Sequence, residues 1–530
     1  MGLCRCLFRS FIFTIITVAV IVLVPNLPPY AKISKSVSIP KITPLDGPFT
    51  INEKLKGIEQ WQKGKVNGPE AFAEYNGELY ASLYPGVVAK QVNEQFVMVA
   101  KTGKSCKNSY DEHICGRPLG IRFDKNGYLY VADAYYGILR FDLKKNEKIT
   151  IVSPNEEIGG AKPMLFNSLD LASNGDIFWS DSSSQFHLND LTFDSLADAS
   201  GRLIRYNANT KKNEVLIDNL RFANGVKLSQ DEDFVLVGET MYNRVHRYYL
   251  KGPKKGTHDI FIEGLPGLVD NIQSDGGDGF ILPLVETVTD DHPSFVHVLL
   301  EFPTARKFIA RLMGLGELAI ETVDKYYPTD YAKSAVHFIG HYRSVSFLGK
   351  SSPFQMIVHV NKAGDVIETF STTDKQFRGY SDAFIFKNQM YLGSPHNDYI
   401  GRIPLSKLGW SESKVKRSVP EPKAEAKQAY KTETKPTTTT PPPSKPTTTP
   451  PPPKTTPKPQ TTAAPKTTQA PKPTVPPTKP SQKPTTAPPK QQTQTPPSTK
   501  PTTPSAKSST SPPAKSTTTP PPKSTTTAPP

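Results

Sequence analysis

Glycine is missing from the last part of the sequence, and this absence divides the 530-residue chain in two. Residues 411–530 contain none of the 34 glycines but 33 of the 53 prolines, in repeats of Thr, Pro and Lys. Such a composition cannot bury a hydrophobic core. We therefore expect a disordered tail here and one folded unit of roughly 350 to 400 residues before it, although the length alone would allow about three domains.

An excess of basic charge is missing from residues 1–410. The formal net charge is +15, but the tail alone carries 19 Lys and Arg against 4 Asp and Glu, so the remaining 45 basic and 45 acidic residues balance. A protein that binds nucleic acid needs clustered basic side chains on a folded face. The sequence therefore predicts no nucleic-acid partner.

The chain has a single long hydrophobic run, Phe11–Val24, which follows Arg5 and Arg9. With its flanks it approaches the roughly 20 residues that cross a bilayer core. No small-residue cleavage site follows it, so an uncleaved signal anchor over 11–27 is favoured over a cleaved signal peptide. The arginines hold residues 1–10 in the cytosol. We expect a single-pass type II protein of the plasma membrane or endoplasmic reticulum, whose later residues are extracellular or lumenal.

Cysteine is scarce, with 4 in the chain. Cys4 and Cys6 lie on the expected cytosolic side, where palmitoylated thiols and unmodified thiols are both open alternatives. Cys106 and Cys115 lie nine residues apart on the other side. An oxidising compartment would join them and stabilise the fold by about 2 to 3 kcal/mol. No Asn-x-Ser/Thr triplet occurs, so N-linked glycans are not expected.

Six copies of a short motif run through residues 61–410, each a Gly, Asp or Asn followed by an alternating strand. The copies begin at Gly77, Gly127, Gly175, Asp233, Gly279 and Asn388. The first five start 46 to 58 residues apart. This spacing is typical of a four-stranded antiparallel blade, whereas a β-sandwich would show shorter spacing. The sequence therefore predicts an all-β, six-bladed β-propeller, preceded by a linker and N-terminal arm over 28–60.

The last two copies are separated by 109 residues, which predicts an insertion in one blade at about 304–333. Within it, Thr304–Tyr326 has helical periodicity. Its apolar stripe consists of Phe308, Ile309, Leu312, Met313 and Leu315, flanked by Arg306, Lys307 and Arg311. Two interpretations are open, a helix that lies on lipid and a helix that packs on its own blade, of which we favour the second.

The central channel of a propeller brings together single residues from several blades, and such a channel suits one ion. Calcium takes six to eight oxygen ligands, which acidic side chains and neutral amides supply. Residues of these types precede the apolar strands of four repeats, namely Glu70, Asn167, Asn224, Asp270 and Asn271. Asn-Gly and Asp-Asn are also ordinary turn dipeptides, so the pattern alone leaves turns at these positions open.

Longer motifs resemble a known family. They are Cys115-Gly-Arg-Pro-Leu-Gly-Ile, Val131-Ala-Asp-Ala-Tyr-Tyr-Gly, Leu220-Arg-Phe-Ala-Asn-Gly-Val, Asp233-Phe-Val-Leu-Val-Gly-Glu-Thr and Pro266-Gly-Leu-Val-Asp-Asn-Ile. They resemble the strictosidine synthase-like branch of the calcium-dependent six-bladed propellers, over about residues 1–410. The resemblance implies a channel Ca²⁺ held by Glu70, Asn167, Asn224, Asp270 and Asn271. In the hydrolytic members of the superfamily, which also contains paraoxonases and gluconolactonase-like regucalcin, that ion polarises an ester or lactone carbonyl.

The sequence also departs from the family pattern. Leu119 and, nearby, Ala134 stand where a paraoxonase-like histidine pair would fall. Ser381 stands near the place of the catalytic glutamate of strictosidine synthase, so alkaloid synthesis is not expected. A hydrolase would need another base, for which we choose Asp270 beside the metal, with Asp382 as the second candidate.

Other polar residues have plainer interpretations. Ser182–Ser184 lacks the Gly-x-Ser-x-Gly elbow of a serine hydrolase, so a turn or channel-lining role is expected. The histidines at His187, His341, His359 and His396 lack metal-ligand spacing. We expect them to be ordinary strand or loop residues.

Two hypotheses of function follow. The first is a membrane-anchored, calcium-dependent hydrolase of arylesterase or lactonase type, with small ester or lactone substrates and Asp270 as its base. The second is a non-catalytic propeller that binds partners or mediates adhesion at the cell surface or in the lumen, with a structural Ca²⁺. The tail is expected to be a mucin-like, O-glycosylated stalk or unmodified disorder. Its basic residues would allow contact with a glycan or protein partner.

Overall fold

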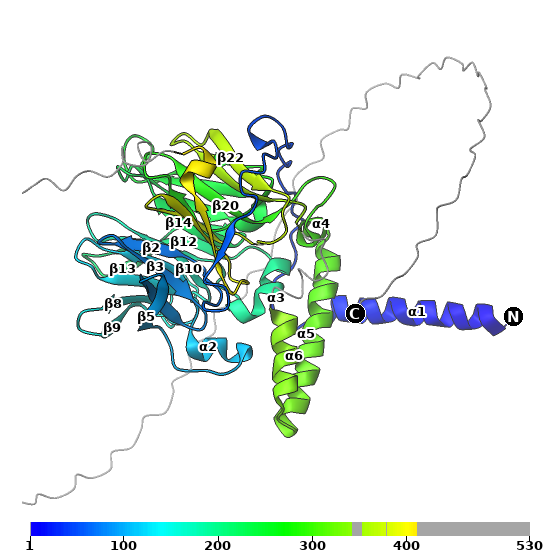
Figure 1. The fold of residues 1–530 in the computed structure, drawn as a ribbon. Helices are drawn as coiled ribbons and strands as arrows, with labels where there is room; N and C mark the ends of the chain where they lie inside the picture. The colour runs from blue at the N-terminus through cyan, green and yellow to red at the C-terminus, as the bar shows by residue number, and fades with distance from the viewer. Residues whose placement is uncertain (1, 342–351, 378, 411–530) are drawn as a thin grey trace, which may run out of the picture. The chain divides into compact units, whose positions relative to one another are not determined.

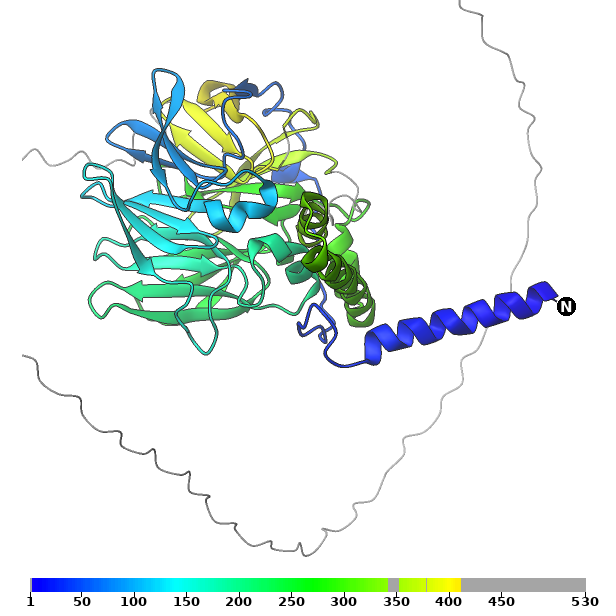
Figure 2. The same ribbon diagram turned by 90° about the horizontal axis from the view of Figure 1, so that it is seen from below.

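Six antiparallel sheets, five of four strands and one of five, form the main body of the protein. The structure, a computed structural model, describes residues 2–341, 352–377 and 379–410, so the prediction for residues 411–530 lies outside the described part. Neighbouring sheets touch in chain order, and the sixth touches the first through β23 and β2. Figures 1 and 2 show the sheets gathered around a common centre. The predicted all-β, six-bladed propeller is confirmed.

Each of the first four blades is one continuous meander. Blade 1 contains β2 (Phe72–Tyr75), β3 (Glu78–Leu83), β4 (Val87–Val92) and β5 (Gln95–Lys101). Blade 2 contains β6 (Pro118–Phe123), β7 (Leu129–Asp133), β8 (Gly137–Asp142) and β9 (Glu147–Val152). Blade 3 contains β10 (Phe166–Leu171), β11 (Ile177–Asp181), β12 (Gly201–Asn207) and β13 (Lys212–Leu220). Blade 4 contains β14 (Ala223–Leu228), β15 (Phe234–Glu239), β16 (Arg244–Tyr249) and β17 (His258–Ile262).

The fifth blade is interrupted, and the sixth is completed by the N-terminal arm. Blade 5 contains β18 (Gly267–Val269), β20 (Phe280–Thr287), β21 (Gln355–Val360) and β22 (Val366–Thr372), with the short β19 (Gln273–Ser274) also paired to β20. Blade 6 contains β23 (Asp382–Phe386), β24 (Gln389–Gly393), β25 (Ile400–Pro404) and β1 (Glu59–Trp61). The expected boundary between arm and propeller, at residues 60 and 61, therefore falls inside β1.

The repeated sequence motif is the second strand of each blade. Its six copies are β3, β7, β11, β15, β20 and β24. Every residue of β11 and β15 is buried, because a second strand lies within its own sheet and between two neighbouring blades. Gly127 and Gly175 open their copies at φ angles of 84° and 88°, a left-handed conformation that strains residues with a Cβ atom.

The helices lie outside the blades. They are α1 (Gly2–Leu23), α2 (Glu112–Cys115), α3 (Leu191–Leu196), α4 (Phe295–Leu300), α5 (Pro303–Tyr326) and α6 (Asp330–Gly340). Short 3-10 helices cover Gly47–Phe49, Ser109–Asp111, Leu188–Asp190, Thr240–Tyr242 and Leu405–Leu408. The insertion in blade 5 is thus longer than the predicted 304–333, since it starts with α4 and ends with α6. Figures 1 and 2 show α3 to α6 on one side of the propeller, between the blades and α1.

Helix α5 packs inward through a line of residues that differs from the predicted stripe. The line is Arg306, Ala310 and Gly314, spaced four residues apart. Ile309 and Met313 of the predicted stripe pack beside it against α3, whereas Leu312 is 52% exposed. Arg306, predicted to lie beside the stripe, is fully buried because its guanidinium donates to two carbonyl oxygens at the end of α3, at 2.8 and 3.1 Å.

Candidate metal centre

The inner strands of three blades share an irregularity at the same position. Their register shifts between Phe166 and Leu169, between Ala223 and Val226, and between Pro118 and Gly120. Such a shift is a β-bulge, which re-aims a side chain out of the regular alternation. The shifts contain Asn167, Asn224 and Leu119, all of which are buried. Two predicted ligands therefore hold equivalent positions in blades 3 and 4, and Leu119 holds that position in blade 2.

Backbone hydrogen bonds between blades hold three more predicted ligands close together. The N–H of Gly225, next to Asn224, donates to the carbonyl oxygen of Asp270 at 3.1 Å. The N–H of Asn271 donates to the carbonyl oxygen of Ser381 at 3.0 Å. The Ser381 hydroxyl in turn donates to the carbonyl oxygen of Glu70 at 2.8 Å. These bonds join blades 4, 5, 6 and 1 around the channel.

Asn167 is tied into the same region through a serine. Its Nδ2 donates to the Ser182 hydroxyl at 2.9 Å, and that hydroxyl donates to the carbonyl oxygen of Ala223 at 2.6 Å. Because Nδ2 is engaged in this way, the amide of Asn167 keeps its oxygen for another partner. Ser182 thus has a structural role, as expected for the Ser182–Ser184 run.

The two acidic side chains of the predicted set are buried and repel each other. Glu70 and Asp270 are 5% and 6% exposed. Burial raises the pKa of Glu70 to about 7, with Arg117 opposing the rise and Asp382 adding to it. Burial also raises the pKa of Asp270 well above its usual value, and Glu70 adds to the rise while a hydrogen bond from Asn224 opposes it. A cation between the carboxylates would relieve this repulsion.

Two amides of the set carry atoms without a hydrogen-bond partner. The buried Oδ1 of Asn224 and the buried Nδ2 of Asn271 have none in the structure. An unpartnered buried polar atom is costly, so it needs an explanation. In Asn271, rotation of the amide by about 180° exchanges the nitrogen and the oxygen. Together with the two carboxylates, these amides form an oxygen-rich donor set that fits a hard divalent cation such as Ca²⁺.

The donor set is not a cluster of the zinc type. Within the described ranges of the chain, no group of three or more His, Cys, Asp or Glu side chains is placed to hold a metal ion. The predicted set has only two such residues, Glu70 and Asp270, and its other members are amides. Amide and carboxylate oxygens suit calcium, whereas imidazole and thiolate suit zinc.

Arg117 is a charged residue of this site that the sequence reasoning missed. Its Nη2 lies 3.4 Å from Glu70 Oε2, and its side chain is 5% exposed. The residue belongs to the Cys115-Gly-Arg-Pro motif that carried the family resemblance, but the motif does not indicate which residue the guanidinium contacts. The pair holds Glu70 in place and partly balances its charge.

Asp382, the second candidate for a base, is already held by donors. Gln273 Nε2 lies 2.9 and 3.0 Å from its two carboxylate oxygens, and the N–H of Phe72 donates to it at 2.8 Å. Burial raises the pKa of Asp382 to about 6, while Arg122 and the bond from Gln273 oppose the rise. These contacts make Asp382 a link between blades 1, 5 and 6.

An apolar cluster stands where a histidine pair would fall in the paraoxonases. We call it the Leu119 cluster, and it contains Leu119, Ala134, Leu165, Leu191 and Phe222. It adjoins the candidate metal centre, because Leu119 holds the same bulge position as two of the amides. His187 lies beside the cluster, and its Nδ1 bonds the carbonyl oxygen of Met164 at 2.8 Å. This bond fixes the tautomer and leaves Nε2 as the free nitrogen.

His359, His396 and the cysteines lie outside the candidate metal centre. His359 Nε2 lies 3.0 Å from Asp275 Oδ2 in blade 5, and burial lowers the pKa of His396 to about 4. Cys106 and Cys115 form the predicted disulfide, with their Cα atoms 5.5 Å apart. Cys6 is an exposed free thiol, and its lipidation, like that of Cys4, stays a prediction.

The fold and this centre define a class, the six-bladed propellers with a buried carboxylate and amide centre in their channel. Two family descriptions match the chain, strictosidine synthase over residues 167–253 and strictosidine synthase-like, N-terminal, over residues 47–90. Adipocyte plasma membrane-associated protein Hemomucin of Drosophila melanogaster is 38% identical over 422 residues, 78% of this chain and 72% of that protein. Adipocyte plasma membrane-associated protein of Rattus norvegicus is 32% identical over 362 residues, 67% of this chain and 88% of that protein. The chain belongs to the adipocyte plasma membrane-associated protein family of strictosidine synthase-like proteins.

Solved structures of similar outline are more distant. A gluconolactonase of Xanthomonas campestris matches with a TM-score of 0.40 and 12% identity, over 65% of this chain and 87% of that one. A calcium-binding protein, regucalcin, of Agrobacterium tumefaciens matches with a TM-score of 0.33 and 11% identity, over 43% of this chain and 71% of that one. The fold assignment above rests on the strand order of the six sheets.

Proposed function

We propose that the protein is a membrane-anchored, calcium-dependent hydrolase of small apolar esters or lactones. The observation that carries the proposal is the buried donor set, in which burial and the neighbouring Glu70 raise the pKa of Asp270 and Asn224 Oδ1 has no partner. The residues that would hold Ca²⁺ are Glu70, Asn167, Asn224, Asp270 and Asn271. When bound there, Ca²⁺ would polarise the carbonyl group of the substrate and stabilise the oxyanion that forms from it.

The residues of the chain supply the rest of the chemistry. Asp270 is the proposed base, which takes a proton from the attacking water at its carboxylate. Its position is fixed by the bond from the N–H of Gly225 and by the Asn224 amide. The Leu119 cluster offers an apolar wall for the acyl part of the substrate and excludes water from that side.

We propose a type II orientation for the anchor, with residues 1–10 in the cytosol and the propeller extracellular or lumenal, at the plasma membrane or in the endoplasmic reticulum. Among the described residues, α1 is the one helix long and apolar enough to cross a membrane, over Arg5–Leu23. The Cys106–Cys115 disulfide supports the outer placement of the propeller, since such bonds persist in oxidising compartments. Contact of the basic tail with a glycan or protein partner stays a prediction.

A second candidate function is a non-catalytic propeller that binds partners and uses Ca²⁺ for rigidity. It is favoured by the apolar residues Leu119 and Ala134 at the place of the histidine pair. It is also favoured by the hydrogen bonds of the centre, since these already join five of the six blades.

The test is the initial rate of aryl ester and lactone hydrolysis by the purified full-length chain in detergent micelles, with calcium and with a chelator. The hydrolase requires calcium-dependent turnover that falls by about 10² or more in Asp270→Asn. It should persist in Asp218→Asn, which removes an exposed carboxylate on β13. No turnover from a chain whose thermal unfolding still responds to calcium would favour the binding propeller.

A further inference from the structure

Exposed aromatic side chains are concentrated on one side of the molecule. Outside α1, the described residues with exposed aromatic rings are Tyr30, Phe302, Tyr326, Tyr327, Tyr331 and Phe338. All of them follow the end of α1 or belong to the helical insertion. The exposed large hydrophobic residues on the propeller strands are all aliphatic, as at Val97 and Ile149. Exposed aromatic residues in such a group mark a surface that meets a partner or a membrane interface.

Helix α5 carries apolar residues on both of its faces. Its inward line is centred on Ala310, while Phe308, Leu312 and Leu315 follow a second line three to four residues apart on the opposite face, with Leu318 beside it. Leu312 and Leu318 are 52% and 44% exposed. Exposed apolar residues in such a line mark a surface that meets a partner or lipid. The propeller covers only one face of α5.

The outward face of α5 is tied to the end of α1. Arg311 Nη1 lies 2.8 Å from the carbonyl oxygens of Ile21, Val22 and Val24, and so caps the last turn of α1. Gly314 lies against Pro28, where an added Cβ would come within 3.0 Å. If α1 spans the bilayer, these contacts hold α5 at the depth where the span ends. Figure 1 shows α5 and α6 running crosswise to α1, as helices that lie along a membrane surface do.

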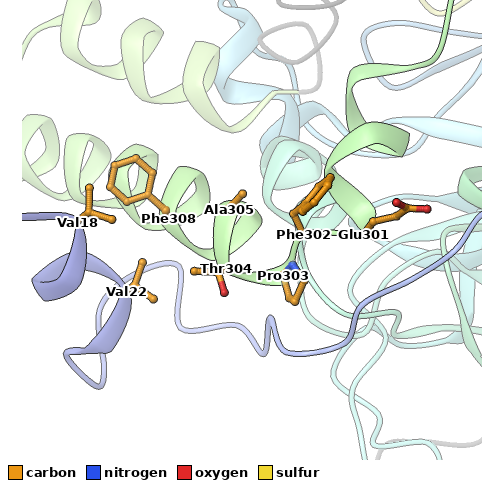
Figure 3. Close-up of a pocket in the computed structure, with 8 residues that line it drawn as sticks. All are labelled: Val18, Val22, Glu301, Phe302, Pro303, Thr304, Ala305 and Phe308. Carbon is orange, nitrogen blue, oxygen red and sulfur yellow. The ribbon is translucent and has the colours of Figure 1, made fainter. Parts of the chain in front are cut away.

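A crevice of about 450 Å³ opens between the two helices. Its walls are Val18, Val22, Phe302, Pro303, Ala305 and Phe308, with Glu301 and Thr304 at the edge. Figure 3 shows the Phe308 ring beside Val18, so the crevice continues the outward face of α5.

The helical layer lies on the same side as the candidate metal centre. Helix α3 contributes Leu191 to the Leu119 cluster, and it contributes Phe193 and Leu196 to the cluster under α5. A surface that docks α5 on a membrane therefore brings the Leu119 cluster towards that membrane. This relation is independent of whether the centre is catalytic.

We propose that α4, α5 and α6 lie in the boundary between headgroups and acyl chains of the bilayer that α1 crosses. The outward face of α5 contacts lipid, and an acyl chain fills the crevice beside Val18. Residues 295–341 hold five basic and five acidic residues, so the contact is driven by apolar area and needs no anionic lipid. The occupant is lipid because the surface is continuous with the membrane span itself.

The test places a tryptophan on this face and asks whether lipid reaches it. The full-length chain is reconstituted into phosphatidylcholine vesicles whose acyl chains are brominated near the headgroup end, which quenches nearby indoles. The variant is Leu312→Trp, and the matched control is Val97→Trp on β5, since the two residues are 52% and 50% exposed. The native Trp61, Trp179 and Trp410 are buried and give a constant background.

The added emission of Leu312→Trp should fall by about half or more in the brominated lipid, at low and at high salt, while that of Val97→Trp stays unchanged. Equal quenching of the two variants, or none at Leu312→Trp, would overturn the proposal. A blue-shifted but unquenched indole would also overturn the proposal if its emission depends on the ratio of protein to lipid. In that case a second copy of the chain would cover this face.

Discussion

Arg117 Nη2 lies 3.4 Å from Glu70 Oε2, and the two side chains are 5% and 7% exposed. This buried pair stands at the edge of the candidate metal centre, where burial raises the pKa of Glu70 and of Asp270 and Glu70 adds to the rise at Asp270. The guanidinium therefore supplies the positive charge that holds Glu70 in place when no cation is bound. A bound divalent cation and Arg117 share this task.

The Arg117→Met variant should unfold at a lower temperature in chelator, because a buried carboxylate without its partner costs about 3 to 5 kcal/mol. Calcium should restore much of this loss, since the ion supplies the missing charge. The measurement is thermal unfolding with calcium and with chelator. The control Lys90→Met breaks a partly exposed pair with Glu78, which is worth at most about 1 kcal/mol and should not depend on calcium. An equal loss in both conditions for Arg117→Met would contradict the shared role.

The Asn224→Leu variant should lose calcium stabilisation, whereas the calcium-free protein should lose only the hydrogen bond from the Asn224 amide to Asp270. The reason is that Oδ1 of Asn224 has no partner, so removing it sacrifices little unless a cation is bound. A ligand present at about 100 times its Kd stabilises by about 2.7 kcal/mol, and this increment should shrink. Asn209→Leu, in an exposed turn, is the control and should keep the full increment. Calcium stabilisation that survives in Asn224→Leu would remove this residue from the ligand set.

The Gly225→Ala variant should destabilise the propeller by about 1 to 3 kcal/mol, because the added methyl group has no room. Its Cβ would lie 2.5 Å from the carbonyl oxygen of Asp270 and from the N of Ile272. The measurement is the free energy of unfolding from denaturant titration. Gly316→Ala is the matched control, since an added Cβ there meets nothing within 4 Å and removes a flexible residue from the middle of α5. A tolerated Gly225→Ala would mean that blades 4 and 5 are not in close contact here.

Asp198 should stabilise the arm that follows α1, and the size of this stabilisation should depend on pH. Burial alone would raise the pKa of this carboxyl, but hydrogen bonds from Ser34 and Lys35 outweigh it and hold the pKa below its usual value. A carboxylate with a depressed pKa stabilises the fold above about pH 4, and that contribution is lost as the pH falls through the folded pKa. Asp198→Asn should therefore cost on the order of 3 kcal/mol at pH 7, because Arg306 also loses its partner 3.8 Å away.

The check is thermal unfolding of wild type and Asp198→Asn from pH 7 down to pH 3. The difference between the unfolding temperatures of the two proteins should stay constant down to about pH 5 and then become smaller. A difference that stays the same across the whole range would mean that the charge of Asp198 is not what holds the arm.

The fold followed from the sequence because each second strand repeats the same pattern. The glycine before it and the alternation within it are local features, so one copy is enough to recognise the next. The closure by β1 was not predictable in this way. Glu59–Trp61 is three residues long, carries no copy of the motif, and pairs with Arg402, Gly401 and Ile400 far along the chain.

The site was predictable in its residue types and not in its geometry. Asn167 and Asn224 stand before apolar strands, and this placement was visible, but the register shifts that set their positions arise only when β10 pairs with β11 and β14 pairs with β15. Arg117 was missed because nothing in its neighbours says that it meets Glu70, which lies in another blade. Long-range pairing of this kind has no local signal.

The pairing of β1 with β25 also decides how the propeller responds to force. The antiparallel register places Glu59, where the chain arrives from the anchor, opposite Arg402, close to where the chain leaves the last blade. A pull between the membrane and the C-terminal end would first load the contacts of the arm, such as that of Ser34 with Asp198, and then this edge, where the strands would separate one pair at a time. The first resistance at the edge is the two-pronged contact of Arg402 with Glu59, at 2.8 and 3.0 Å, backed by the Trp61 ring 4.6 Å from the guanidinium. The pairing of β1 with β25 closes the ring of blades, and force on the two ends of the chain can open it.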